Sequence, residues 1–97
     1  SNQLTGMLEK LVLIDGEFEQ EQAREILMNF FSTKIKFHEM KNFSSQVRFG
    51  KNDEVAQNRI SELRNSTAQI MKILEEAKMN NKKLTITSTI DIGFSTD

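Results

Sequence analysis

The sequence predicts a mainly α-helical fold, a long antiparallel helical hairpin with a short β-strand at each end. In two stretches, about 19–48 and about 53–79, apolar residues recur at alternating spacings of three and four, the period of a helix with one packed face. Between them, residues 49–52 (FGKN) have the composition of a tight turn. The stretch at about 83–94 alternates apolar and polar residues as a strand does. We therefore expect the order strand–helix–helix–strand.

Composition limits the classes of protein to consider. The chain has 97 residues, of which 37% are hydrophobic and 28% charged, a balance that suits helices with one apolar stripe in a single domain, 1–97. Residues 1–6 are expected to be tag-derived or disordered. The net charge of −1 gives no general attraction to nucleic acid or acidic membranes. The absence of cysteine excludes disulfides and thiolate chemistry, and no apolar run approaches a membrane span of ~18–20 residues. These features predict a cytoplasmic protein.

The N-terminal segment at about 8–15 is expected to form a short strand. Leu11 through Ile14 are all apolar, which favours a strand buried on both faces, with a helical turn as the alternative. Asp15-Gly16 then predicts a turn before the first helix.

The first helix carries two apolar stripes. We expect the longer one to be the seam against the second helix, and the shorter one to widen the apolar face in the first half only. The longer stripe consists of Ala23, Ile26, Phe30, Thr33, Phe37, Met40, Ser44 and Val47; the shorter one consists of Leu27, Phe31 and Ile35.

The turn and the second helix have clear start and stop signals. Gly50 suits a left-handed C-cap, Asn52 or Asp53 suits an N-cap, and Asn80-Asn81 suits the second helix end. Small residues of the second seam are expected to face Phe30 and Phe37. The second seam consists of Ala56, Ile60, Leu63, Thr67, Ile70, Leu74 and Ala77.

One hairpin cannot cover both stripes of the first helix together with the apolar face of its strands. We therefore expect a homodimer in which two hairpins form a four-helix bundle. The competing monomer would fold its strands back over the second stripe. The pattern leaves open whether the strands pair within or between subunits.

Residues that could support chemistry are few. His38 is the only histidine and has no helix-spaced ligand partner, so a surface role is the favoured interpretation and a polar site the alternative. No catalytic residue, metal site or cofactor is expected. The turn could present an interaction tip, since aromatic residues and arginine are frequent in binding hot spots, although turn packing is the favoured interpretation. The tip residues are Phe43, Ser45, Gln46, Arg48, Phe49 and Lys51.

The segments IDGEF (14–18), KIKFH (34–38), NFSSQVRFGK (42–51) and ITSTIDI (86–92) resemble a group of small uncharacterised bacterial helical-hairpin proteins. The resemblance implies no activity. It marks His38, Ser44, Ser45, Gln46, Arg48 and Gly50 as positions to test.

The sequence therefore favours a non-enzymatic, self-associating module for protein interaction or structural support, with an unidentified protein as a further partner. One alternative is a nucleic-acid-associated regulator of the antitoxin or phage type. Another is a ligand or metal site at the dimer seam around His38.

Overall fold

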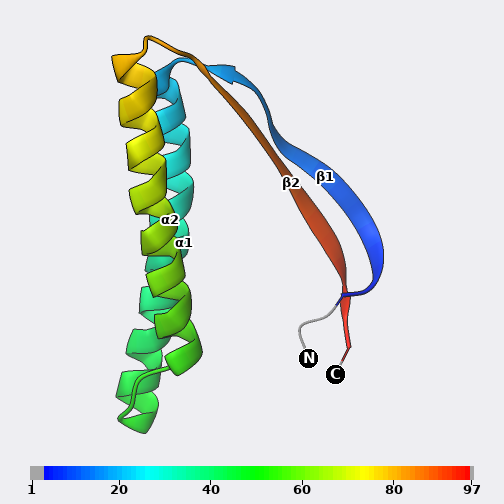
Figure 1. Ribbon diagram of the computed structural model, residues 1–97. Coiled ribbons are helices and arrows are strands. Elements are labelled where there is room, and N and C mark those ends of the chain that lie inside the picture. Colours follow the sequence, from blue (N-terminus) through cyan, green and yellow to red (C-terminus); the bar gives the residue numbers. More distant parts are fainter. Residues whose placement is uncertain (1–3, 97) are drawn as a thin grey trace.

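The computed structural model describes residues 4–96 and contains two helices and two strands, in the order that the sequence predicts (Figure 1). The elements are β1 (Leu4–Phe18), α1 (Gln20–Phe49), α2 (Glu54–Met79) and β2 (Leu84–Ser95). The helices form an antiparallel hairpin, and the strands pair with each other to form a two-stranded antiparallel ribbon. The prediction of a mainly α-helical hairpin with flanking strands is confirmed. None of the described helices is long and apolar enough to cross a membrane.

Caps delimit both helices, and those at Gly50, Asp53 and Asn80-Asn81 are as expected. The amide N–H of Glu19 donates to Gln22 Oε1 at 3.2 Å where α1 begins, and α1 ends at Gly50, which has a left-handed φ of 67°. Asp53 is the N-cap of α2, and its side chain accepts a hydrogen bond from the Ala56 amide at 3.0 Å. Asn80 is the C-cap, and the following Asn81 has a φ of 52°. These caps satisfy backbone groups that a helix end leaves without intrahelical partners.

The predicted seam of α2 is confirmed, because all of its members are buried or half-buried. Leu74 is 1% exposed and is the largest fully buried side chain in the described part of the chain. The remaining buried seam residues are Ala56, Leu63 and Ala77; the half-buried ones are Ile60, Thr67 and Ile70.

The predicted seam of α1 is wrong over most of its length. Half-buried residues that line the contact with α2 define an inner stripe: Leu27, Phe31, Ile35, His38 and Asn42. Phe31 shares a groove with Leu63, and His38 shares one with Ala56. The longer stripe is buried or half-buried only near its start, at Ala23 and Ile26. Its members from Phe30 to Val47 are exposed, and Phe30 lies at the edge of the groove that contains Phe31 and Leu63. Phe37 therefore does not pack against the small residues of α2.

The ribbon is longer than predicted and has one apolar face. β1 runs to Phe18, so Asp15-Gly16 lies within the strand and forms no turn. Burial of β1 on both faces is also wrong, because Leu11, Val12 and Leu13 are all exposed. Residues that lie opposite each other in the register share a face. The apolar face of the ribbon consists of Leu11, Ile14, Phe18, Leu84, Ile86, Ile90 and Ile92.

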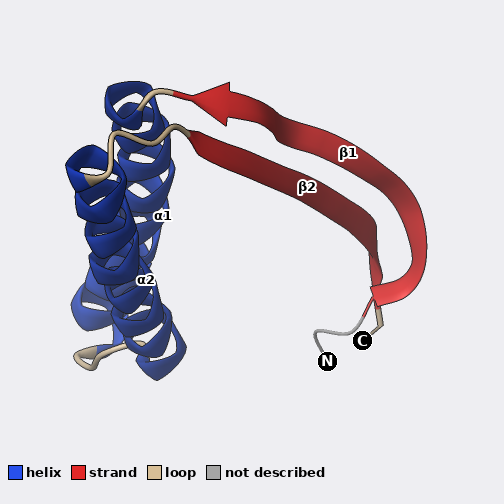
Figure 2. Ribbon diagram, turned by 45° about the horizontal axis from the view of Figure 1, so that its top comes forward, coloured by secondary structure: helices blue, strands red, loops and turns tan. Residues whose placement is uncertain are grey.

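The ribbon does not fold back over the hairpin. It leaves the end of the hairpin opposite the Gly50 turn and diverges on the side of α1, so its far end lies well away from the helices (Figures 1 and 2). The whole chain is correspondingly broad and thin, with extents of 49 × 34 × 15 Å.

Candidate functional site

Polar side chains close the turn between the helices. Asn42 Oδ1 accepts a hydrogen bond from the Asp53 amide at 2.6 Å. Asn52 Oδ1 accepts from Gln46 Nε2 at 2.7 Å and from Asn42 Nδ2 at 3.3 Å. Ser45 Oγ donates to the Lys51 carbonyl at 2.9 Å. These bonds connect one face of α1 to the turn and to the start of α2, and so orient that face toward α2.

The structure divides the predicted interaction tip into two groups. Ser45 and Gln46 belong to the network that closes the turn, which gives them a structural task. The remaining tip residues, Phe43, Arg48, Phe49 and Lys51, have exposed side chains. From the sequence, Asn42 is not singled out and Asn52 is considered only as an N-cap, although an asparagine on each side of a glycine turn is a signal for side-chain to backbone bonding.

His38 lies beside the hairpin seam and not at an isolated polar site. Its ring meets the Phe37 ring edge-on, with centroids 5.2 Å apart. The groove beside it also contains Lys41, Arg59 and Glu62. Within the part of the chain that the structure describes, no group of three or more histidine, cysteine or acidic residues could hold a metal ion.

The outer stripe of α1 is an exposed surface of the hairpin that contains large apolar residues. Phe37, Met40 and Val47 on this stripe are 56, 63 and 69% exposed. The stripe keeps alternating spacings of three and four from one end of α1 to the other, as the seam of a packed helix does. Its members are Ile26, Phe30, Thr33, Phe37, Met40, Ser44 and Val47.

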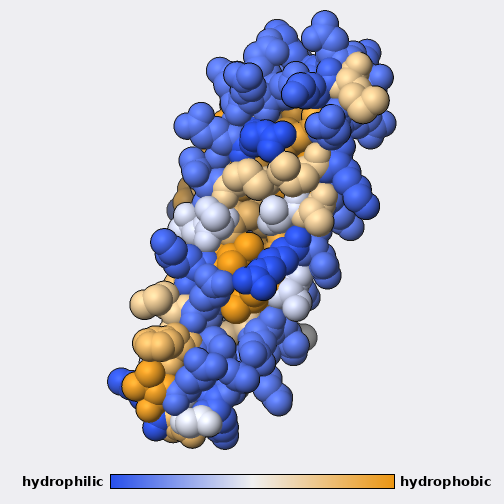
Figure 3. Space-filling model, turned by 90° about the vertical axis from the view of Figure 1, so that its left-hand side faces the viewer, coloured by the Kyte–Doolittle hydropathy of each residue, from blue (hydrophilic) through white to orange (hydrophobic). Residues whose placement is uncertain are grey.

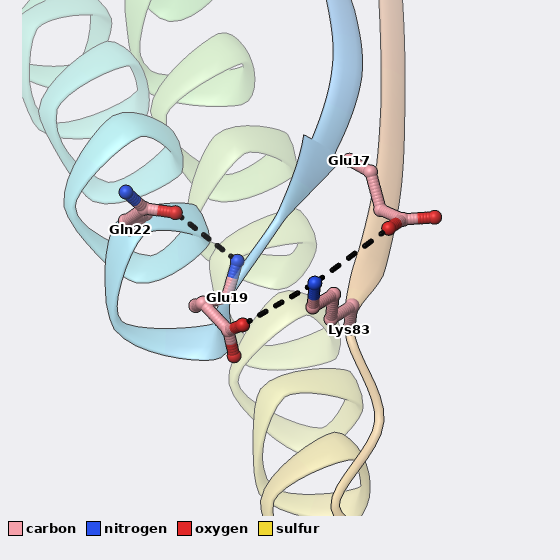
Figure 4. A network of polar contacts seen from close by, with 4 residues as sticks. All are labelled: Glu17, Glu19, Gln22 and Lys83. Carbon is pink, nitrogen blue, oxygen red and sulfur yellow. Dashed lines mark hydrogen bonds and ion pairs between the residues drawn. The ribbon is translucent and has the colours of Figure 1, made fainter.

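The ribbon carries a second apolar surface. Near the helices its apolar face is half-buried, at Ile14, Phe18 and Ile86, whereas Ile90 and Ile92 farther out are exposed. The junction itself is polar. Lys83 Nζ lies 3.6 Å from Glu19 Oε1 and 3.9 Å from Glu17 Oε1, beside the bond from the Glu19 amide to Gln22 (Figure 4). The ribbon is thus attached to the helices at its base, and its apolar face continues outward without cover from residues 4–96.

The side of the molecule away from the ribbon has a mainly hydrophilic surface. Viewed from that side, apolar atoms form only an interrupted band (Figure 3).

The total exposed area of the chain is larger than that of a compact monomer of the same mass. The chain exposes 7806 Å², whereas a compact monomer of 11.2 kDa exposes roughly 5,700 Å². The excess of about 2,100 Å² is close to what one subunit of an obligate dimer buries, since such interfaces remove roughly 2,000–5,000 Å² in total.

Comparisons with protein-family models, with curated proteins and with solved structures give no match, and so they assign no function. The resemblance to small bacterial hairpin proteins stays a prediction. The candidate functional site is therefore defined by the chain's own surfaces, the outer stripe of α1 and the apolar face of the ribbon.

Proposed function

We propose that this protein is a non-enzymatic, self-associating helical-hairpin module that acts in protein interaction or structural support, and that its unit is a homodimer built on a four-helix bundle. The outer stripe of α1 is the observation that carries the proposal. Phe37, Met40 and Val47 lie on it with more than half of each side chain exposed.

The spacing of the stripe supports a helical partner. Residues that alternate at three and four along a helix meet a neighbouring helix in successive layers, side chains of one filling the spaces of the other. In α1 the inner stripe is already used by α2, and the outer stripe offers a second seam of the same period. A second copy supplies a matching seam without requiring any other molecule.

The shape of the hairpin also supports a helical partner. In the first half of α1, Phe30 of the outer stripe and Phe31 of the inner stripe line one groove with Leu63 of α2. Side chains from a partner helix on the outer stripe would enter this groove and touch both helices. Each helix of a four-helix bundle makes such a contact with two neighbours.

The proposal is tested by placing charge on the outer stripe. We expect Met40→Glu to shift the chain from dimer to monomer by multi-angle light scattering at micromolar concentration, because a buried unpaired carboxylate is strongly unfavourable. Ala68→Glu is the matched control, since Ala68 is exposed on α2 and lies outside both apolar surfaces. We expect the control to keep the mass of a dimer.

Circular dichroism separates loss of association from loss of folding. A wild-type chain that is a well-folded monomer at these concentrations would contradict the proposal. So would a Met40→Glu variant that still dimerises as tightly as the Ala68→Glu control.

A further inference from the structure

The ribbon has two unpaired edges, because β1 and β2 pair only with each other in the part of the chain described by the structure. An exposed strand edge presents unpaired N–H and C=O groups and can pair with a strand from another chain. The two edges of this ribbon differ in how well they could do so.

The edge of β1 is interrupted. The register between the strands shifts at three places, between Leu4 and Met7, between Met7 and Glu9, and between Val12 and Ile14. At each place the extra residue lies in β1, so β1 has 15 residues where β2 has 12. Extra residues bend a strand and disturb its hydrogen-bonding pattern, which is one way in which sheet edges are protected from pairing.

The edge of β2 has none of these features. Its sequence, LTITSTIDIGFS, contains a single charged residue, Asp91, and no lysine or proline. Asp91 is already beside Lys10 of β1, with Asp91 Oδ1 3.9 Å from Lys10 Nζ. By contrast, β1 carries four charged side chains from Glu9 to Glu17. The β2 edge is thus regular, rich in β-branched residues and suited to pairing.

We propose that two copies of the chain join through the β2 edges, so that β2 of each copy pairs antiparallel with β2 of the other in a four-stranded sheet of order β1-β2-β2-β1. This rests on the proposed self-association and adds to it where the ribbons meet. The occupant of the edge is a second copy because the surplus exposed area matches a dimer and because a two-fold axis supplies an identical regular edge.

The two-fold symmetry places the apolar faces of both ribbons on the same side of the sheet. Two neighbouring antiparallel strands that are related by a two-fold axis have that axis perpendicular to the sheet, so both ribbons turn the same face to the same side. The apolar faces of the two ribbons, each including Ile86 and Ile90, then form one surface of doubled width. Thr85, Thr87 and Thr89 of the two copies lie side by side on the other face.

Site-directed spin labelling tests this arrangement, because the chain has no native cysteine. Single variants Thr85→Cys, Thr87→Cys and Thr89→Cys are labelled with a nitroxide, and distances within the full-length dimer are measured by electron paramagnetic resonance. In an antiparallel pair, moving the label two residues away from the axis lengthens the separation along the strands by about 14 Å, at ~3.4 Å per residue on each strand. We therefore expect the separation to be shortest at the position nearest the axis and to increase with distance from it, which is the gradient along β2 that the proposal requires.

Asp15→Cys is the matched control, since Asp15 lies opposite Thr87 in the register. In the proposed sheet a label at position 15 is three strand spacings from its counterpart, about 14 Å across the sheet, whereas a label at position 87 is one spacing away, about 5 Å. We therefore expect the distance at position 15 to exceed the distance at position 87. The reverse order would assign the contact to β1 and overturn the proposal.

Light scattering on each labelled sample separates this inference from the proposed function. A wild-type chain that is monomeric contradicts both the proposed function and the pairing of the ribbons. A dimer in which the distance between labels shows no gradient along β2 contradicts only the pairing of the ribbons. If labels on β2 abolish the dimer and the label at position 15 does not, the β2 edge is the interface; loss of the dimer with the label at position 15 alone contradicts it.

Discussion

The two helices have similar apolar patterns but use them differently. In α2 the residues at heptad spacing, such as Leu63 and Leu74, lie inside the hairpin. In α1 the longest heptad pattern, which includes Phe37 and Met40, lies outside, and a shorter stripe that continues through His38 and Asn42 faces α2. A heptad pattern thus identifies a packing face without identifying the partner.

The polar turn explains this difference. Because Asn42 accepts from the Asp53 amide and Gln46 donates to Asn52, the face of α1 that contains Asn42 must point toward α2 near the turn. Residues one and two turns earlier on the same face, His38 and Ile35, then follow along the helix. The outer stripe lies on another face and is directed away from α2.

The largest expected effect comes from the packed seam of α2. Leu74→Ala is expected to lower the free energy of unfolding by about 2–5 kcal/mol, because it leaves a cavity at a residue that is 1% exposed. Ile73→Ala, one position away and 52% exposed, is the control and should cost much less. Urea unfolding monitored by circular dichroism measures both. Equal losses would mean that Ile73 is as well packed as Leu74.

An intermediate effect is expected at the turn. Asn42→Ala removes the acceptor for the Asp53 amide and is expected to lower the free energy of unfolding by about 1–2 kcal/mol. Asn65→Ala, at an exposed position of α2, serves as the control in the same urea unfolding experiment and should change stability little. If the two variants were equally stable, the turn network would not account for the rotation of α1.

The smallest effect is expected at the junction of the ribbon. Lys83→Ala removes two ion pairs, but the lysine and both glutamates are more than half exposed, so the expected loss is about 0.5 kcal/mol or less. Lys82→Ala is the matched control, because Lys82 forms no ion pair within residues 4–96. Thermal unfolding at low and at high salt compares them. A loss well above that of the control would show that the junction orients the ribbon strongly.

The local features of the fold could be predicted from the sequence. The sequence predicts the cap at Gly50, narrows the N-cap of α2 to Asn52 or Asp53, of which the structure has Asp53, and predicts the end of α2 at Asn80-Asn81. Caps depend on one residue type and its immediate neighbours. The alternating faces of β2 and the seam of α2 were also recognised, since each contains one periodic pattern and no competing one.

The relative rotation of the helices could not be predicted in the same way. α1 contains two stripes, and periodicity does not rank them. Which stripe faces α2 depends on Asn42 and Asn52, residues 10 positions apart in the chain that meet only when the hairpin closes. The exposed members of the interaction tip could be named from their types, but not the structural task of Ser45 and Gln46.

Helix positions, their ends and the strand periodicity follow from neighbouring residues, because capping and local periodicity act over a few positions. The pairing of β1 with β2, the three register shifts in β1 and the divergence of the ribbon from α1 depend on contacts between the two ends of the chain. Those contacts exist only in the folded chain. The tertiary structure therefore decided which apolar stripe lies inside the hairpin and which surfaces stay exposed.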